Sequence, residues 1–189
     1  MPRVKMISVR SESAVRDAIP ADVGAIREVA SAANQEFRSP LGETLFAGYL
    51  ANVLDVESRA RDAVVLVAEG GAEIIGTITI YRDINEEGMP TAFPPGTAGI
   101  RATAVSPTVR GQGIGSELVN AAIARARSFG ARTVALHTAD CMEAAMRLYE
   151  RHGFQRAPEY DYRANEFFAD GAGAPLDALA FVLELDDTR

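Results

Sequence analysis

The chain has 189 residues, enough for one hydrophobic core, and its 48% hydrophobic and 24% charged residues are ordinary for a globular domain. Its 19 Lys and Arg against 26 Asp and Glu give a net charge of −7, which disfavours nucleic acid as a partner and mildly attracts a cationic amine. No apolar run is long enough to cross a bilayer, and the single cysteine, Cys141, excludes an internal disulfide. We therefore expect a cytoplasmic protein with no membrane partner.

The N-terminal part predicts a strand followed by a helix. Residues 1–12 have no clear pattern, and we expect them to form an arm ahead of one domain that comprises residues 13–189. Residues 14–18 predict a short strand that ends before a proline. Asp22 is a typical helix cap, and the residues after it carry apolar side chains at helical spacing.

The next segment predicts a loop, a helix and two paired strands. We expect a loop at 35–42, and apolar residues three or four apart between 45 and 56 predict a helix. Residues 63–69 are almost continuously apolar, as in a strand covered on both faces, and the two glycines that follow suit a tight hairpin. Residues 74–81 alternate with a period of two, which predicts the partner strand.

The centre of the chain predicts a strand, a glycine turn and a helix. A long polar loop at 83–96 leads into an apolar, β-branched strand at 97–105. The helix that follows the turn has Ile114, Leu118 and Ala122 on one face.

The C-terminal part alternates strands and helices. We expect, in order, a helix stop at Gly130, a strand at 133–138, a helix from Asp140 or Cys141 to His152, a strand beginning at Gly153, a loop at 163–175 and a last strand at 176–185. The whole succession predicts a mixed α/β fold, with a central mixed sheet and helices on both sides.

The turn between the central strand and its helix suits an anion. Gly111, Gly113 and Gly115 let the backbone approach a ligand, and the first amides of the helix lack intrahelical partners. The helix dipole favours a phosphate there, and the side chains of Arg110 and Ser116 add donors. The Walker pattern is absent because no lysine follows the glycines, and a dinucleotide fingerprint would need a third glycine in place of Ser116. The alternatives are a phosphate or diphosphate site and a tight turn that only caps the helix.

Two motifs resemble those of the GNAT superfamily, the acyl-CoA-dependent N-acyltransferases. The first is Arg-x-x-Gly-x-Gly at 110–115, after a strand that ends in Ala-Val-x-Pro. The second lies at 144–154, where Ala145, Leu148 and Tyr149, followed by Gly-Phe, fall at the family's positions. The order of elements also matches over nearly the whole chain. The resemblance implies a twisted, mostly antiparallel sheet of about six or seven strands, with about four helices on its two faces.

The resemblance further implies transfer of an acetyl group from acetyl-CoA to the primary amine of a small molecule or a peptide. The first pair of helices would form one wall of the acceptor groove, with Glu36, Phe37 and Tyr49 as candidate substrate contacts. Related domains often dimerise, so a homodimer is a further expectation. The expected coenzyme-binding residues are Thr103, Val105, Arg110, Gly111, Gln112, Gly113, Ile114, Gly115, Ser116, Met142, Ala145 and Tyr149.

The implied reaction needs a base, an oxyanion donor and an acid. An alkylammonium with a pKa of about 10 must lose a proton before it attacks, and Glu86, Glu87 and Asp161 are the candidate bases by loop position. The resemblance assigns the oxyanion donor to the backbone N–H of Val105, in a strand that splays from its neighbour, and the proton for the leaving thiolate to Tyr149.

Two departures from the family pattern leave part of this mechanism open. Met142 stands where the family usually has an asparagine that binds the coenzyme, so that contact is lost or replaced. Residues 98–101 lack the glutamate that many members use as a base. The alternative function is therefore a non-catalytic acyl-CoA-binding sensor, and a third is transfer of a longer or carboxylated acyl group.

The remaining reactive side chains predict structural roles. His137 lies in an expected strand and His152 at a helix end, without the spacing of metal ligands, so we expect no metal. Cys141 has no cysteine partner, and it would need a nearby base to carry an acyl group.

Overall fold

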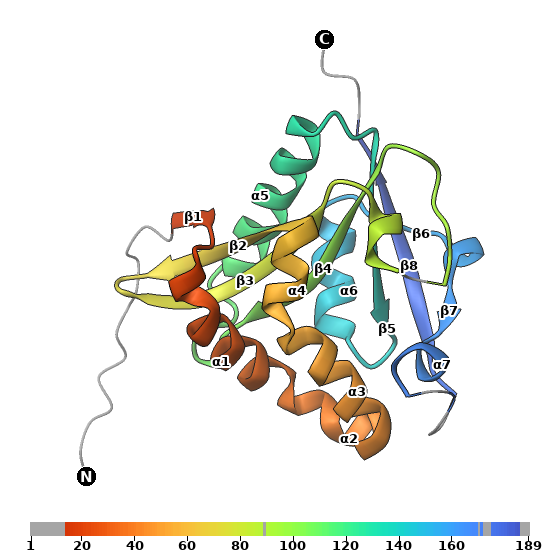
Figure 1. The fold of residues 1–189 in the computed structure, drawn as a ribbon, viewed down its shortest axis with the longest axis horizontal. Coiled ribbons are helices and arrows are strands. Elements are labelled where there is room, and N and C mark those ends of the chain that lie inside the picture. Colours follow the sequence, from red (N-terminus) through yellow and green to blue (C-terminus); the bar gives the residue numbers. More distant parts are fainter. Residues whose placement is uncertain (1–13, 89, 170, 172–174, 186–189) are drawn as a thin grey trace.

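The computed structural model describes residues 14–88, 90–169, 171 and 175–185, and the arm expected at 1–12 lies outside this part of the chain. The described residues form an eight-stranded sheet in the order β1-β2-β3-β4-β5-β8-β6, with β7 beside β8 (Figure 1). Every pair is antiparallel except β4 with β5. The mixed α/β class is confirmed. The strands are β1 (Ala14–Asp17), β2 (Ala63–Gly70), β3 (Glu73–Tyr81), β4 (Thr97–Val105), β5 (Thr133–Ala139), β6 (Gln155–Arg156), β7 (Tyr162–Arg163) and β8 (Asp177–Glu184).

The helices cover both faces of this sheet. On one face, Ile26 of α1 and Val56 of α4 pack against Val67 of β2. On the other face, Leu118 of α5 packs against Ile78 of β3. Neighbouring residues of a strand point to opposite faces, so the nearly continuous apolar runs of β2 and β3 supply both cores. The helices are α1 (Val23–Asn34), α2 (Arg38–Leu41), α3 (Glu43–Leu54), α4 (Val56–Asp62), α5 (Ile114–Ser128), α6 (Glu143–Arg151) and α7 (Ala164–Phe168).

Helix α5 links the parallel strands β4 and β5, because parallel neighbours need a crossover connection. Its expected apolar stripe is confirmed: Ile114, Leu118 and Ala122 are buried, and burial of one such leucine stabilises by roughly 2 kcal/mol. Gly76 of β3 lets the helix sit close to the sheet, since a Cβ at Gly76 would lie 2.9 Å from Leu118 Cδ1. The sheet thereby fixes where the glycine turn and the first turn of α5 lie.

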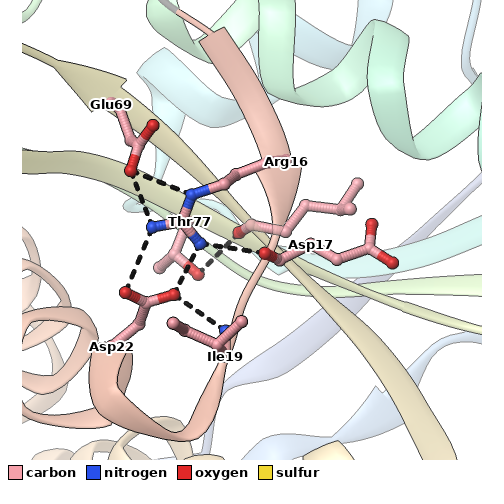
Figure 2. A network of polar contacts seen from close by, with 7 residues as sticks. Arg16, Asp17, Ile19, Asp22, Glu69 and Thr77 are labelled. Carbon is pink, nitrogen blue, oxygen red and sulfur yellow. Dashed lines mark hydrogen bonds and ion pairs between the residues drawn. The ribbon is translucent and has the colours of Figure 1, made fainter.

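A network of charges holds the edge strand β1 on the sheet (Figure 2). The guanidinium of Arg16 donates to Glu69 on β2 at 2.6 Å and to Asp22 at 2.7 Å. Asp22 was expected to cap α1, but its carboxylate binds none of the amides of α1. It accepts instead from the N–H of Ile19 at 2.8 Å, and so closes the turn before the helix. Arg16 redirects the carboxylate because a charge-assisted bond is stronger than a neutral cap.

Three segments expected as loops contain helical turns, and the one at 83–96 holds the 3-10 turn η3 (Ile84–Glu87). Residues 35–42 form the 3-10 turn η2 (Gln35–Phe37) and then α2. The proline of α2 falls in the first turn of the helix, where its missing N–H costs no intrahelical hydrogen bond. Residues 163–175 contain α7, a single turn that follows no helical period of its own. Its two phenylalanines pack on Tyr49 and Tyr162, so tertiary contacts stabilise it.

Other element boundaries shift by one to three residues. Helix α6 begins at Glu143 rather than at Asp140 or Cys141, because Met142 takes the cap position and its carbonyl accepts from the N–H of Ala145. The expected strand at Gly153 begins at β6 instead. Within the residues that the structure describes, no helix combines the length and the hydropathy that a membrane crossing requires.

Candidate functional site

Strands β4 and β5 pair at one end only and then separate. Their parallel ladder runs from Thr97 with Thr133 to Ile100 with Leu136, and the remainder of β4 has no partner on this side among the described strands. A bulge accompanies the separation, because the register with β3 shifts at this point and Ala102 has a φ of 50°. The result is a wedge-shaped opening in the middle of the sheet.

A cavity of about 510 Å³ occupies this opening. It extends from the glycine turn before α5 to α3 and α7 on the opposite face of the sheet. Of the expected coenzyme-binding residues, only Gln112 is missing from its wall, since that side chain is exposed on the turn. The residues that do line the cavity are Thr103, Val105, Arg110, Gly111, Gly113, Ile114, Gly115, Ser116, Met142, Ala145 and Tyr149.

The glycine turn presents free backbone donors to one end of the cavity. Gly111 and Gly113 have φ values of 77° and 95°, which side chains rarely tolerate, and Gly113 is the residue before α5. The first amides of α5 have no carbonyl four residues earlier in the helix, so they can donate to a ligand. Gly115 faces Leu148 of α6, and a Cβ there would lie 3.1 Å from Leu148 Cδ2. The turn is therefore shaped for an anion.

The side chain of Arg110 does not extend freely into this end of the cavity. It pairs with the carboxylate of Glu36 at 2.8 Å and donates to the carbonyl of Ala33, also at 2.8 Å. Both partners lie at the end of α1, so the arginine ties the glycine turn to the first helix. Glu36, one of the expected substrate contacts, is thus an ion-pair partner on the cavity wall.

The N–H of Val105 points into the wedge. Ser106 donates to the carbonyl of Ile75 at 2.8 Å, so this pair is a hydrogen-bonded one. Its neighbours, Val105 and Gly76, therefore form a non-hydrogen-bonded pair, in which both backbones turn their polar groups away from each other. For Val105 this direction is the side where β5 has separated from β4.

Tyr149 of α6 closes the cavity from the other side. Its hydroxyl donates to Thr103 Oγ1 of β4 at 3.1 Å, and the side chain packs edge-on against Phe154. Only 5% of the residue is exposed. Burial raises the pKa of the phenol, so it stays protonated at neutral pH and acts as a donor.

The sequence between α1 and the end of α6 matches a known family. Residues 25–154 fit the family model described as the acetyltransferase (GNAT) family. The chain belongs to the GNAT family. Both motifs quoted above lie within this matched part, whereas Tyr162, Ala164, Phe168, Leu176 and Ala178 of the cavity wall lie beyond it.

Solved GNAT acetyltransferases share this fold. A ribosomal-protein-alanine N-acetyltransferase from Brucella melitensis is 23% identical, with a TM-score of 0.65 over 91% of this chain and 99% of that one. PaiA N-acetyltransferase from Thermoplasma acidophilum, solved in complex with coenzyme A, is 14% identical, with a TM-score of 0.67 over 92% of this chain and 99% of that one. These likenesses establish the GNAT fold.

One curated relative is closer in sequence over a shorter region. A mouse (Mus musculus) protein named "Probable N-acetyltransferase family 8 member 5" is 36% identical over 97 residues. The match covers 50% of this GNAT chain but only 39% of the mouse protein's length.

The structure adds His137 to the cavity wall, although the sequence favoured a purely structural role for it. The residue lies one position beyond Leu136, the last residue of β5 that pairs with β4. Its Nε2–H donates to the carbonyl of Tyr160 at 2.9 Å, which leaves Nδ1 as the basic atom of the neutral ring. Burial lowers the pKa of this imidazole, and the nearby charge of Arg101 lowers it further. No sequence signal marks the residue, because its position depends on where the strands part.

Two of the three carboxylates considered as bases, Glu86 and Asp161, are absent from the cavity wall. Glu86 faces a separate shallow hollow beside Asp62 and Arg82, and the side chain of Glu87 lies outside the described residues. Asp161 accepts from Arg156 at 2.8 Å and from the N–H of Ala180 at 2.7 Å. Burial alone would raise the pKa of Asp161, but these bonds outweigh it and hold the pKa below its usual range. Loop position does not determine which way a side chain faces, so the sequence alone could not place Glu86 and Asp161 relative to the cavity.

The first helices form the opposite wall of the cavity, as expected. Phe37 and Tyr49 line it, and the Tyr49 hydroxyl donates to Asn34 Oδ1 at 2.8 Å. Helix α7 completes this wall because Gly48 of α3 lets it approach. A Cβ at Gly48 would lie 1.8 Å from the carbonyl oxygen of Phe168, so only glycine fits.

Cys141 is absent from this wall. Burial raises the pKa of its thiol, which disfavours the nucleophilic thiolate. Among the described residues, no group of three or more His, Cys, Asp or Glu side chains is arranged to hold a metal ion.

Proposed function

We propose that this protein transfers an acetyl group from acetyl-CoA to a primary amine by direct attack on the thioester. The single observation that carries the proposal is the wedge between β4 and β5, which joins an anion-binding turn at one end to an unpaired amide and a buried phenol in the middle. Both the complex of the Thermoplasma relative with coenzyme A and the N-acetyltransferase names of the relatives support this choice of donor.

In the proposed complex the diphosphate of the coenzyme binds the amides at Gly113, Ile114 and Gly115, next to the guanidinium of Arg110. The other expected contacts, including Met142 and Ala145, would line the path of the pantetheine. The side chain of Met142 offers no strong hydrogen bond there. The buried hydroxyl of Thr138 on the same cavity wall has no partner among the described residues and is a candidate replacement. Val105 would then donate its N–H to the thioester oxygen.

The proposed reaction uses three groups of the chain. The neutral amine attacks the thioester carbon, the new C–N bond forms, and the oxyanion accepts from the N–H of Val105; one such donor is worth about 3 kcal/mol. When the C–S bond breaks, the Tyr149 hydroxyl protonates the thiolate. Nδ1 of His137 takes the proton that the amine loses, either directly or through water. Because Val105 acts through its backbone, its replacement by isoleucine should leave the chemistry unchanged.

A turnover assay tests the proposed function against the sensor alternative. The purified chain is incubated with acetyl-CoA and a panel of primary amines, including amino acids, polyamines and short peptides, and free thiol is measured. We expect release of thiol that depends on the amine and an N-acetylated product by mass spectrometry. Tight coenzyme binding by calorimetry, without release for any acceptor, would favour the sensor. Faster consumption of a longer or carboxylated thioester would favour the third function.

The cellular compartment, the domain boundaries and the oligomeric state are further proposals that do not depend on the reaction. A single cysteine suits a reducing compartment, and we propose the cytoplasm. We also propose one domain for residues 13–189 and a homodimer, which size-exclusion chromatography with light scattering would test.

A further inference from the structure

Strand β8 has a gap in its pairing directly opposite the proposed base. On the side away from β5, β6 pairs as far as Phe181 and β7 begins to pair at Ala178. The segment 157–161, which joins β6 to β7, therefore passes beside Ala180 without forming a strand. Ala180 is fully buried, and on its other side it is the antiparallel partner of His137 in β5. Whatever fills the gap thus lies one strand away from His137.

The side chains of Asp161 and Arg156 fill this gap. The carboxylate of Asp161 accepts from the N–H of Ala180 at 2.7 Å. Arg156 donates to the carbonyl of Ala180 at 2.5 Å, and to the two oxygens of that carboxylate at 3.0 and 2.8 Å. The pair supplies the partners that a neighbouring strand would give to a buried backbone. It thereby anchors the end of the segment 157–161 to β8.

The carbonyl just before Asp161 contacts the proposed base. The peptide that joins Tyr160 to Asp161 carries the oxygen that accepts from Nε2–H of His137 at 2.9 Å. The ring of Tyr160 stacks on Phe93 with centroids 4.3 Å apart, and the ring of His137 packs edge-on against Phe93 at 5.6 Å. Because the carboxylate is fixed to β8, the carbonyl one residue earlier is held against the imidazole. With the proton on Nε2, Nδ1 keeps the lone pair that a base needs.

The charges around the imidazole indicate that Asp161 acts through its hydrogen bonds. Burial is the main cause that lowers the pKa of His137, and the positive charges of Arg101 on β4 and Arg156 on β6 lower it further. The negative charge of Asp161 raises this pKa, so the two members of the anchoring pair oppose each other. The phenol of Tyr162 packs edge-on at 4.8 Å. What the carboxylate adds is therefore mainly the position of the carbonyl.

We propose that Asp161 is a positioning residue: by binding the N–H of Ala180, it holds the Tyr160 carbonyl on Nε2–H of His137 and keeps Nδ1 as the basic atom. The proposal rests on the acetyl transfer proposed above, in which His137 takes the proton of the amine. Asp161 itself exchanges no proton with the substrate. A base that is fixed in one tautomer loses no time in the unproductive one.

Nuclear magnetic resonance of the ring nitrogens tests the proposal without any turnover. The chain has two histidines, and His152 offers the opposite reference, since its Nδ1 contacts the carbonyl of Leu148 at 2.8 Å. At mildly alkaline pH, where an imidazole is neutral, we expect the proton on Nε2 in His137 and on Nδ1 in His152. In Asp161→Ala the two nitrogen signals of His137 should move toward each other, because the ring then exchanges between tautomers. Those of His152 should stay.

Kinetics separate positioning from charge. Asp161→Ala should lower kcat by about tenfold or more, a part of what a general base contributes, while the dissociation constant of coenzyme A changes by less than about twofold. Asp161→Asn should keep kcat within about threefold of the parent, because the amide oxygen still accepts from the N–H of Ala180. Asp177→Ala is the matched control: it removes a carboxylate of β8 that pairs with Arg163 at an exposed site, and kcat should stay the same.

Each outcome bears on one claim. Unchanged nitrogen signals of His137 in Asp161→Ala would overturn the proposal, and so would a loss of kcat in Asp161→Asn as large as in Asp161→Ala. If Asp161→Ala fails to fold, the unaltered protein still decides, since a proton on Nδ1 of His137 would contradict the proposed hold. Absence of amine-dependent thiol release in the unaltered protein would overturn the acetyl transfer, whereas the nitrogen signals would still show whether Asp161 fixes the ring.

Discussion

Tyr149 is buried, and its hydroxyl donates a hydrogen bond to Thr103 on β4 beside the wedge. Burial suits a packing role and the hydroxyl suits a role as proton donor, and one substitution can separate the two. If the phenol protonates the leaving thiolate, Tyr149→Phe should lower kcat by about 100-fold, as expected for loss of a general acid. The dissociation constant of coenzyme A, measured by calorimetry, should change by less than about twofold, because the ring still packs against Phe154. Equal losses of rate and affinity would indicate that the tyrosine serves packing alone.

His137 predicts a pH dependence whose sign follows from its surroundings. Burial lowers the pKa of the imidazole below its ordinary value of 6.5, so the ring is a neutral base at neutral pH. We expect kcat/KM to fall only when the pH drops through this lowered pKa, as the ring becomes protonated. In His137→Gln, activity should be low and this acidic limb should disappear from the profile. An unchanged limb in the variant would assign it to another group.

The glycine turn is an element whose backbone, rather than its side chains, makes the expected contacts. Gly113→Ala forces an alanine into a φ of 95°, and Gly115→Val drives a side chain against Leu148. Either change should weaken coenzyme A binding by about tenfold or more, since the donors move. Gly24→Ala in α1 is the matched control: its Cβ meets open space, and coenzyme affinity should stay the same. Unaltered affinity in both turn variants would contradict the proposed coenzyme site.

Strand β1 depends on the carboxylate of Asp22, which predicts how stability changes with acid. The hydrogen bond from Arg16 and that from the N–H of Ile19 lower the pKa of Asp22 below 3.8 in the folded chain. Its stabilisation is therefore complete above pH 3.8 and is lost as the pH falls through the lower, folded pKa. Denaturant titrations should find Asp22→Asn less stable than the parent at pH 7, with a difference that shrinks in acid. A constant difference would exclude this linkage.

For the whole molecule, periodicity and glycine placement predicted most strands, the crossover helix and the glycine turn, whereas the other expected residues of the cavity wall came from the family resemblance. The apolar stripe on α5 and the positive φ of Gly113 follow from residues that are close in the sequence. The family resemblance assigns Tyr149 to the coenzyme site, and the structure places this residue on the cavity wall.

The missed features all depend on contacts between distant segments. Helix α7 is a single turn that cannot nucleate alone and exists through its packing on α3. Arg101 and His137 face the cavity because β4 bulges and parts from β5, and no local pattern encodes that point. A loop position likewise gives no side-chain direction, so the sequence could not tell that Glu86 and Asp161 lie outside the cavity wall.

The contact of Gly48 with the carbonyl of Phe168 has a consequence for laboratory evolution of this enzyme. A library that randomises residues of the cavity wall can exchange the side chains of Leu41, Leu45 or Leu176 one at a time, because each of them lines the cavity and fills space there. Residue 48 must stay glycine, because any larger residue would displace α7 from α3. Selection for new amines should therefore return varied residues at those leucines and invariably glycine at 48; frequent survivors with alanine there would show that α7 is dispensable.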